Sequence, residues 1–223
     1  MSESTENIAR HLDHTVLAPA ATDADMARGC EIARQFGTAA AFVKPHFVIE
    51  ASKILAGSIV KVGTVVGFPQ GLALPPILAD EAEMAIDMGA REIDMVVNIG
   101  KVLSEDWDYV STCIAGVAEV VKSRGLIIKV IFETCYLADS HKIMLCRICE
   151  QAGVHFAKTS TGFGPGGATE ADVALMAHHL KSVKVKAAGG IRTLEQVRRY
   201  LDLGASRIGT SSTQQIMAEV RAN

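Results

Sequence analysis

Five charged residues stand inside, or at the end of, segments that otherwise read as buried β-strands. The segments are HLDHTVL, EIDMVVNIG, KVIFETC, HFAKTS and VKVKAAGG. The charged residues are Asp13, Asp94, Glu133, Lys158 and Lys186. A strand buried on both faces is normally a continuous apolar run, and a buried charge costs several kcal/mol unless it is paired. Because this cost is repeated five times, the pattern favours a catalytic site over isolated structural ion pairs.

Two lysines in such a group suggest Schiff-base chemistry. An amine attacks a carbonyl carbon only when it is uncharged, and an ordinary lysine is protonated at neutral pH. A second ammonium about 6 Å away, at an effective dielectric constant near 20, opposes protonation by roughly 2.8 kcal/mol, or about 2 pKa units, and desolvation adds to this. Lys158 and Lys186 could therefore supply one nucleophilic amine, and Asp94 could move the protons. A protonated imine then withdraws electrons, as aldol cleavage requires. The residues alone do not identify which lysine attacks.

Two segments that follow predicted strands indicate an anion site. KAAGGIRT and RIGTSS place glycines and serines directly after the last two strands and before helices. The residues concerned are Gly189, Gly190, Gly209, Ser211 and Ser212. Exposed backbone N–H groups and helix N-termini bind phosphate. The nearby segment TSTGFGPGG is also rich in glycine and could contribute Thr161 and Gly162.

The elements that must position these residues follow one repeated unit: an amphipathic helix, a glycine, then a short apolar strand. The glycines are Gly37, Gly89, Gly125, Gly153 and Gly204. Glycine just past a helix end adopts the left-handed conformation without strain, so each one marks a helix-to-strand junction. Short strands that alternate with helices predict parallel strands joined by crossover helices.

Eight strands are predicted, at 12–15, 39–43, 60–66, 92–97, 127–132, 154–157, 183–187 and 207–209. Helices are predicted at 23–36, 46–55, 76–88, 106–122, 139–151, 170–179, 194–203 and 212–220, with an additional N-terminal helix at 3–11. A doubly wound sheet would carry a glycine-rich fingerprint after its first strand, where this chain reads DHTVLAPAAT. We therefore expect an α/β fold, a (β/α)8 TIM barrel in one domain spanning residues 1–223.

In a barrel of this type, active sites lie at the carboxyl ends of the strands, and phosphate is commonly bound after strands seven and eight. Four of the five charged residues fall toward the carboxyl-terminal half of their predicted strands. The two proposed halves of the site, lysines and anion loops, therefore belong at the same mouth.

Composition excludes several other classes of protein. The formal net charge of −3 gives no electrostatic attraction to nucleic acid or to an anionic membrane. The longest uncharged run, 62–79, is interrupted by glycines and prolines and does not predict a membrane span. Five cysteines without framework spacing fit a reducing compartment, and Cys146 and Cys149 are interpreted as buried residues of a helix. Residues 1–10 lack the pattern of a secretion signal, so we expect a cytoplasmic protein.

The segments DHT, VGFPQG, EIDMVVNIG, KVIFETC, FAKTSTGF, VKAAGGIRT and GTSS occur in this order, and together they resemble the deoxyribose-phosphate aldolase family. The resemblance implies that Lys158 forms the Schiff base, that Lys186 lowers its pKa, and that Asp94 relays protons. It implies supporting roles for Asp13 and Glu133.

The same resemblance implies phosphate binding at Gly189, Gly190, Ser211 and Ser212. The implied reaction is reversible cleavage of 2-deoxy-D-ribose 5-phosphate to D-glyceraldehyde 3-phosphate and acetaldehyde, without a metal or organic cofactor. A cytoplasmic homodimer or homotetramer is implied, with a small phosphorylated sugar as the only non-protein partner.

Phe42 and Lys44 are among the residues that depart from the family pattern. Phe42 stands where many members have a cysteine, which bears on tolerance of aldehydes more than on the reaction, and Lys44 precedes the proline of the second loop. Two alternatives remain open from the residues: another Schiff-base aldolase or a transaldolase acting on a different donor, and a catalytically silent barrel that binds a phosphometabolite.

Overall fold

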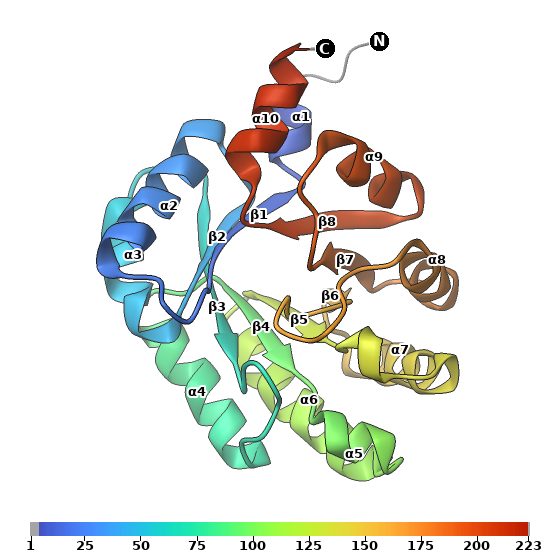
Figure 1. The fold of residues 1–223 in the computed structure, drawn as a ribbon. Helices are drawn as coiled ribbons and strands as arrows, with labels where there is room; N and C mark the ends of the chain where they lie inside the picture. Colours follow the sequence, from blue (N-terminus) through green and yellow to red (C-terminus); the bar gives the residue numbers. More distant parts are fainter. Residues whose placement is uncertain (1–4, 223) are drawn as a thin grey trace.

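The structure, a computed structural model, describes residues 5–222 as a closed barrel of eight parallel strands with helices around it (Figure 1). Each strand pairs with the next along the chain, and β8 pairs with β1 to close the barrel. The strands are β1 Leu12–Val16, β2 Ala40–Val43, β3 Lys61–Val66, β4 Glu92–Val96, β5 Ile127–Ile131, β6 Phe156–Lys158, β7 Lys184–Ala188 and β8 Ala205–Thr210. The predicted TIM barrel is confirmed.

The helices form the outer layer. They are α1 Thr5–Ala9, α2 Asp23–Phe36, α3 Val48–Ile54, α4 Pro75–Asp87, α5 Ile99–Leu103, α6 Trp107–Ser123, α7 Asp139–Ala152, α8 Glu170–His179, α9 Leu194–Asp202 and α10 Thr213–Ala222, with 3-10 turns η1 Pro45–Phe47 and η2 Thr134–Tyr136. The additional N-terminal helix is present as α1, although part of its predicted range, residues 3 and 4, lies outside the described residues.

Local sequence signals account for most helix ends. Thr193 and Gln196 form a capping box at the start of α9. All five predicted junction glycines have positive φ, from 62° at Gly153 to 118° at Gly89. Each of the five helices before these glycines therefore ends where a residue without Cβ lets the chain turn toward the next strand.

The predicted boundaries were wrong at several places. Strand β8 begins at Ala205 instead of at residue 207. The helix expected at 46–55 is divided into η1 and α3. The short helix α5, capped by the Asn98 side chain, was not predicted. Strand β6 begins at Phe156 instead of Val154, because the Val154 N–H donates to Cys149 O (3.2 Å) and so closes the end of α7.

The strand charges lie deeper than predicted. Lys158 is the last residue of β6 and Glu133 follows β5, as expected for the mouth. Asp94 and Lys186, however, occupy the third position of five-residue strands, and Asp13 is the second residue of β1. The charged site therefore extends from the mouth into the middle of the barrel.

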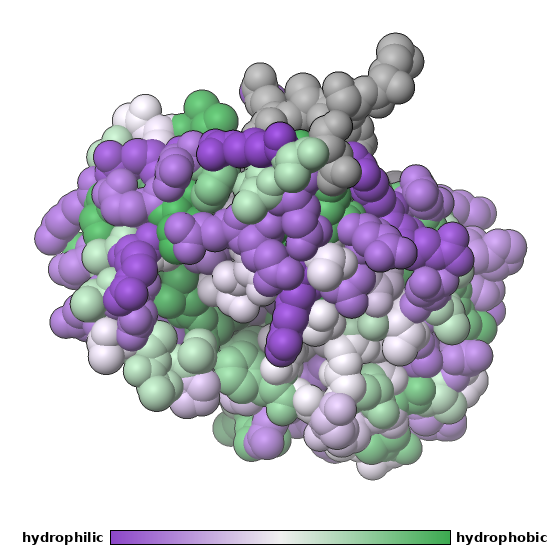
Figure 2. Space-filling view, turned by 45° about the horizontal axis from the view of Figure 1, so that its top comes forward, coloured by the Kyte–Doolittle hydropathy of each residue, from purple (hydrophilic) through white to green (hydrophobic). Residues whose placement is uncertain are grey.

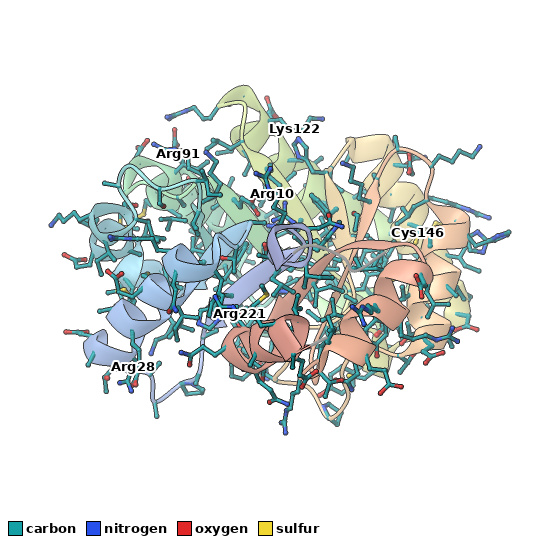
Figure 3. All side chains as sticks on the ribbon, turned by 90° about the horizontal axis from the view of Figure 1, so that it is seen from above. Arg10, Arg28, Arg91, Lys122, Cys146 and Arg221 are labelled. Carbon is teal, nitrogen blue, oxygen red and sulfur yellow. The ribbon has the colours of Figure 1, made fainter. Side chains whose placement is uncertain are left out.

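The outer surface carries the polar residues. Hydrophilic side chains cover much of the face shown in Figure 2, with hydrophobic residues interspersed. In the part of the chain that the structure describes, no helix is both long and apolar enough to cross a bilayer. Cys146 (Figure 3) and Cys149 are buried in α7 as predicted, and burial raises the pKa of the Cys146 thiol to about 12.

Candidate active site

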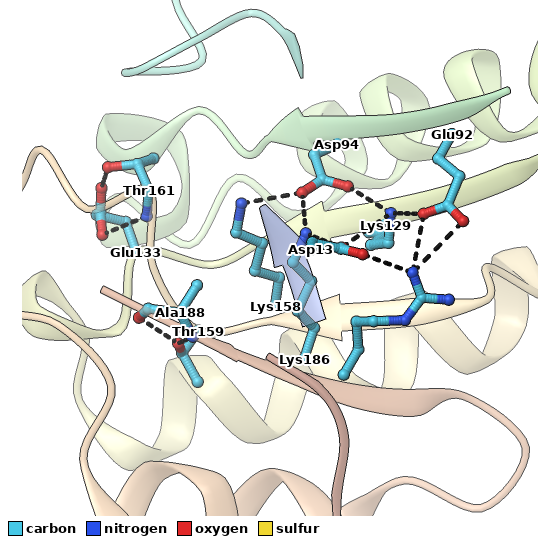
Figure 4. A network of polar contacts seen from close by, with 11 residues as sticks. Asp13, Glu92, Asp94, Lys129, Glu133, Lys158, Thr159, Thr161, Lys186 and Ala188 are labelled. Carbon is cyan, nitrogen blue, oxygen red and sulfur yellow. Dashed lines mark hydrogen bonds and ion pairs between the residues drawn. The ribbon is translucent and has the colours of Figure 1, made fainter. Parts of the chain in front are cut away.

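A cluster of seven charged side chains fills one side of the barrel interior (Figure 4). We call it the lysine cluster. Its members are Asp13, Glu92, Asp94, Lys129, Lys158, Lys186 and Arg207. Strand register brings them together: Lys158 is level with Lys186 across β6 and β7, and Asp94 is level with Lys129 across β4 and β5. Since register partners in a parallel sheet face the same side, these side chains converge without any loop.

Asp94 is the centre of the cluster. Its Oδ2 accepts from Lys158 Nζ at 2.9 Å and from Lys186 Nζ at 2.7 Å. Its Oδ1 pairs with Lys129 Nζ at 3.0 Å. One carboxylate therefore links both lysines predicted from the sequence and could pass a proton between them.

Asp13, Glu92 and Arg207 form ion pairs that hold the lysines of the cluster in place. Asp13 Oδ2 lies 2.6 Å from Lys186 Nζ, and Asp13 Oδ1 lies 2.6 Å from Arg207 Nη1. Glu92 accepts from Lys129 and, at 3.2 Å, from Arg207. A continuous chain of ion pairs thus runs from Arg207 near the base of β8 to Lys158 at the mouth.

The number of charges favours one uncharged lysine. Three carboxylates face three lysines and one arginine. Full ionisation would leave one net positive charge among buried groups, and an unbalanced buried charge is costly. Loss of one proton from a lysine makes the cluster neutral. The arrangement therefore provides the uncharged amine that Schiff-base formation needs.

The pKa shifts in the cluster agree with this balance. Burial alone would raise the pKa of Asp94, but the attraction of Lys129, Lys158 and Lys186 holds it well below its usual range. Burial also opposes ionisation of Asp13, whose pKa nevertheless falls to about 2 beside Lys186. Burial lowers the pKa of Lys186 to about 8, against the attraction of Asp13 and Asp94. Asp13 and Asp94 therefore stay charged, and the pKa of Lys186 comes close to physiological pH.

The two lysines differ in their access to solvent. Lys158 lines a cavity of about 610 Å³ at the barrel mouth. Lys186 is not among the residues that line this cavity, and none of its surface is exposed. A substrate in the cavity can therefore reach the Lys158 amine. Lys186 is linked to Lys158 through Asp94, whose Oδ2 accepts a hydrogen bond from both lysines.

The predicted anion loops line the same cavity. The residues shared with the prediction are Thr161, Gly162, Gly189, Gly190, Gly209 and Ser211. Gly189 and Gly190 have φ of 92° and 80°, so the loop after β7 takes a conformation that other residues rarely adopt. Ser212 does not line the cavity; its N–H donates to Thr210 Oγ1 (2.9 Å) at the start of α10.

Glu133 lies apart from the lysine cluster (Figure 4). Its carboxylate accepts from Thr161 N at 3.1 Å and from the Thr161 hydroxyl. Its φ of 58° is unusual for a residue with a side chain. These contacts tie the end of β5 to the loop after β6, so the geometry favours a role in holding that loop over a direct contact with the lysines.

Four residues of the site were missed from the sequence: Glu92, Lys129, Arg207 and Arg192. Lys129 carried the same signal as Lys186, a lysine inside an apolar strand. Glu92 and Arg207 were taken as the first residues of predicted strands, where charges are ordinarily exposed. Arg192 lines the cavity beside Gly190 and adds a cationic side chain to the anion loops.

A second cavity of about 440 Å³ adjoins the mouth on the side of β2, β3 and α4. It is lined largely by apolar residues such as Val65, Phe68 and Met84, and it contains no member of the lysine cluster. The larger cavity, which Lys158 lines, is therefore the candidate active site.

Comparison with known proteins agrees with this geometry. Residues 8–216 match the model of the DeoC/LacD family aldolases. The chain is 47% identical to deoxyribose-phosphate aldolase of Caldanaerobacter subterraneus subsp. tengcongensis, over 97% of this chain and 95% of that protein. It is 44% identical to the enzyme of the same name from Rhodopirellula baltica, over 96% and 90% of the two chains.

Solved structures show the same relationship. The tetrameric deoxyribose phosphate aldolase of Aeropyrum pernix superposes with a TM-score of 0.91 at 31% identity, covering 98% of this chain and 93% of that one. The aldolase QR15 superposes with a TM-score of 0.91 at 35% identity, covering 97% and 96%. With its barrel, its paired lysines and these relatives, the chain belongs to the DeoC/LacD family of aldolases.

Proposed function

We propose that this chain catalyses the reversible cleavage of 2-deoxy-D-ribose 5-phosphate to D-glyceraldehyde 3-phosphate and acetaldehyde through a Schiff base on Lys158. One observation carries the proposal: Lys158, the glycines of the anion loops and Ser211 line one cavity, and a second lysine pairs with the same carboxylate oxygen as Lys158. The reacting amine and the phosphate site are thus within reach of one small sugar phosphate.

The substrate binds as the open-chain aldehyde. Its phosphate lies against the loops after β7 and β8, where backbone N–H groups and the N-terminus of α10 supply donors and Arg192 supplies positive charge. This places the aldehyde carbon, C1, toward Lys158. Binding energy from the phosphate is used to orient the far end of the molecule.

Covalent catalysis begins when uncharged Lys158 Nζ adds to C1. The adduct takes up one proton, delivered through Asp94 or a water molecule, and loses water to give a protonated imine. The C3 hydroxyl then gives up its proton, to Asp94 or through a water molecule, as the C2–C3 bond breaks. The electron pair of that bond moves into the imine and forms an enamine, and D-glyceraldehyde 3-phosphate leaves.

The enamine then takes a proton at C2. Water adds to the resulting imine, Lys158 is released as the free amine, and acetaldehyde leaves. Every step uses groups of the chain, the substrate and water, so the atoms balance without a further reactant. Lys129 and the protonated form of Lys186 lie beside Asp94, and their positive charge favours release of a proton from Lys158.

The assembly and setting are part of the same proposal. We place residues 1–223 in one domain that acts as a homodimer or homotetramer in the cytoplasm. A tetrameric family member supports the oligomer. The five free cysteines, only one of which is exposed, support a reducing compartment.

The test is a cleavage assay that detects D-glyceraldehyde 3-phosphate, run with Lys158→Met and with Lys184→Met as a matched control. Lys184 is an exposed lysine at the start of β7. We expect turnover in the wild type and the control and none in Lys158→Met. In the synthetic direction, use of dihydroxyacetone instead of acetaldehyde as donor would reject the proposal in favour of another Schiff-base aldolase.

A further inference from the structure

An aromatic ring lies among the lysines. Phe42, on β2, is fully buried inside the barrel. The centre of its ring is 4.1 Å from Lys186 Nζ, 4.3 Å from Lys129 Nζ and 6.0 Å from Lys158 Nζ. The amino groups of three lysines thus lie near one ring, and the ring is closest to the two lysines that do not line the cavity.

The neighbouring strand is shaped to hold this ring. A Cβ added to Gly63 would lie 2.4 to 2.7 Å from three atoms of the Phe42 ring, so the ring packs directly on the glycine backbone. Leu17, Ala40 and Val65 complete the apolar side of the barrel interior. The ring is therefore fixed at the boundary between this apolar side and the lysine cluster.

The face of an aromatic ring carries partial negative charge and stabilises a nearby cation, more strongly where water is excluded. The stabilisation falls with distance, so it favours the ammonium forms of Lys186 and Lys129 over that of Lys158. Lys158 and Lys186 compete for protons because both bind Asp94 Oδ2. Stabilising the protonated form of Lys186 therefore leaves Lys158 uncharged for more of the time.

We propose that Phe42 is a positioning residue for the proton: its ring retains the charge on Lys186 and Lys129 and so keeps Lys158 available as the nucleophile. This inference rests on the proposed function, since it assumes that Lys158 forms the imine. Phe42 does not line the cavity, so the ring acts through the lysines and not through the substrate.

The other charges around the pair are fixed by their own partners. Asp13 faces Lys186 from β1, Asp94 faces both lysines from β4, and Glu92 faces Lys129 from the start of β4. Arg207 from β8 lies over a different ring, that of Phe156, at 5.2 Å. The ring of Phe42 can therefore be varied without changing a charged partner of either lysine.

The experiment replaces Phe42 alone with 4-fluoro- and then 3,5-difluorophenylalanine, which keep the shape of the ring and weaken its negative face. The rate of borohydride trapping with acetaldehyde is measured against pH. We expect the rate at neutral pH to fall stepwise with fluorination, by about twofold to thirtyfold in all, and to be regained at higher pH, where both lysines lose their protons.

Phe42→Leu should give the same displacement of the pH profile toward higher pH. Val65→Ala is the matched control, since it opens space in the same apolar cluster and leaves the ring in place; its profile should keep the wild-type midpoint. An unchanged profile across the fluorinated series, with the adduct still on Lys158, would overturn the inference and leave the proposed function intact. No adduct on Lys158 in the wild type would instead reject the proposed function.

Discussion

The lysine cluster reaches the barrel mouth at Lys158, beside the anion loops, but the two regions are built in opposite ways. The cluster consists of long charged side chains from β1 and from β4 to β8, and its members are paired and almost completely buried. The anion loops consist of backbone and small side chains, with Gly189 and Gly190 in the left-handed region and Ser211 exposed.

We assign the reaction to the lysine cluster and the binding of the substrate phosphate to the anion loops. A charge inside the barrel cannot be replaced without upsetting its partners, whereas a backbone N–H depends only on the conformation of the loop. Substitutions in the cluster should therefore lower kcat, and substitutions in the loops should raise KM for the phosphorylated substrate.

Removal of the nucleophile should have the largest effect. Lys158→Met deletes the amine that forms the imine, and we expect kcat to fall on the order of 10⁴-fold or more, as for other covalent nucleophiles. Single-turnover kinetics with 2-deoxy-D-ribose 5-phosphate would measure this. A variant that keeps more than a few per cent of the wild-type rate would break the assignment of the reaction to the cluster.

Removal of the second lysine should be the next largest. Lys186→Met leaves three carboxylates facing three cationic groups, a balance that is reached with Lys158 protonated. We expect the trapping rate at neutral pH to fall about 100-fold and the midpoint of its pH profile to rise by about 2 units, while phosphate affinity is retained. A trapping rate equal to that of the wild type would remove Lys186 from the mechanism.

A change in the anion loops should affect binding instead. In Gly189→Ala the added Cβ would lie 2.9 Å from Gly167 Cα, at a φ of 92°. We expect KM for the phosphorylated sugar to rise about tenfold with little change in kcat, since a hydrogen bond to a charged group is worth roughly 1.5–3 kcal/mol.

The control for this change is Gly116→Ala in α6, where a Cβ would meet no atom within 4 Å. It should leave KM as it is. Cleavage of unphosphorylated 2-deoxyribose should not change in Gly189→Ala. A fall in kcat for both sugars would contradict the assignment of the anion loops to phosphate binding alone.

The carboxylates of the cluster should make stability depend on acid pH. The pKa of Asp13 is about 2 in the folded chain, against an ordinary value of 3.8, so the unfolded chain binds the proton more tightly. The contribution, about 2 kcal/mol, is present above pH 3.8 and is lost as the pH falls through about 2. Asp94 acts in the same direction.

Urea unfolding at a series of acid pH values would measure this dependence. Asp13→Asn should be less stable than the wild type at neutral pH, because Lys186 and Arg207 lose a charged partner. It should also lose less stability on acidification. Parallel curves for the two proteins would show that Asp13 is not held ionised by the cluster.

The fold could be predicted from the sequence because its signals are local. Glycine after each helix and apolar strands between helices are read directly from neighbouring residues. The helix α5 was missed since its five residues include Gly100 and are too few to show a helical period. The late start of β6 was missed because it depends on a hydrogen bond across the end of α7.

The site was predictable only where a charge interrupted an apolar strand. That signal identified Asp13, Asp94, Lys158 and Lys186, and it was present but overlooked at Lys129. Glu92 and Arg207 began their predicted strands, where a charge is ordinarily exposed; in the structure Arg207 is the third residue of β8, and closure of the barrel brings it against Glu92. Which carboxylate pairs with which lysine depends on strand register, which is set by the whole barrel and not by any one segment.

The identity of the trapped lysine tests the account most directly. The protein is incubated with acetaldehyde, reduced with borohydride and digested, and the peptides are analysed by mass spectrometry. We expect a two-carbon adduct on the peptide that contains Lys158, with Lys186 unmodified. An adduct confined to Lys186, or no adduct on either lysine, would contradict it.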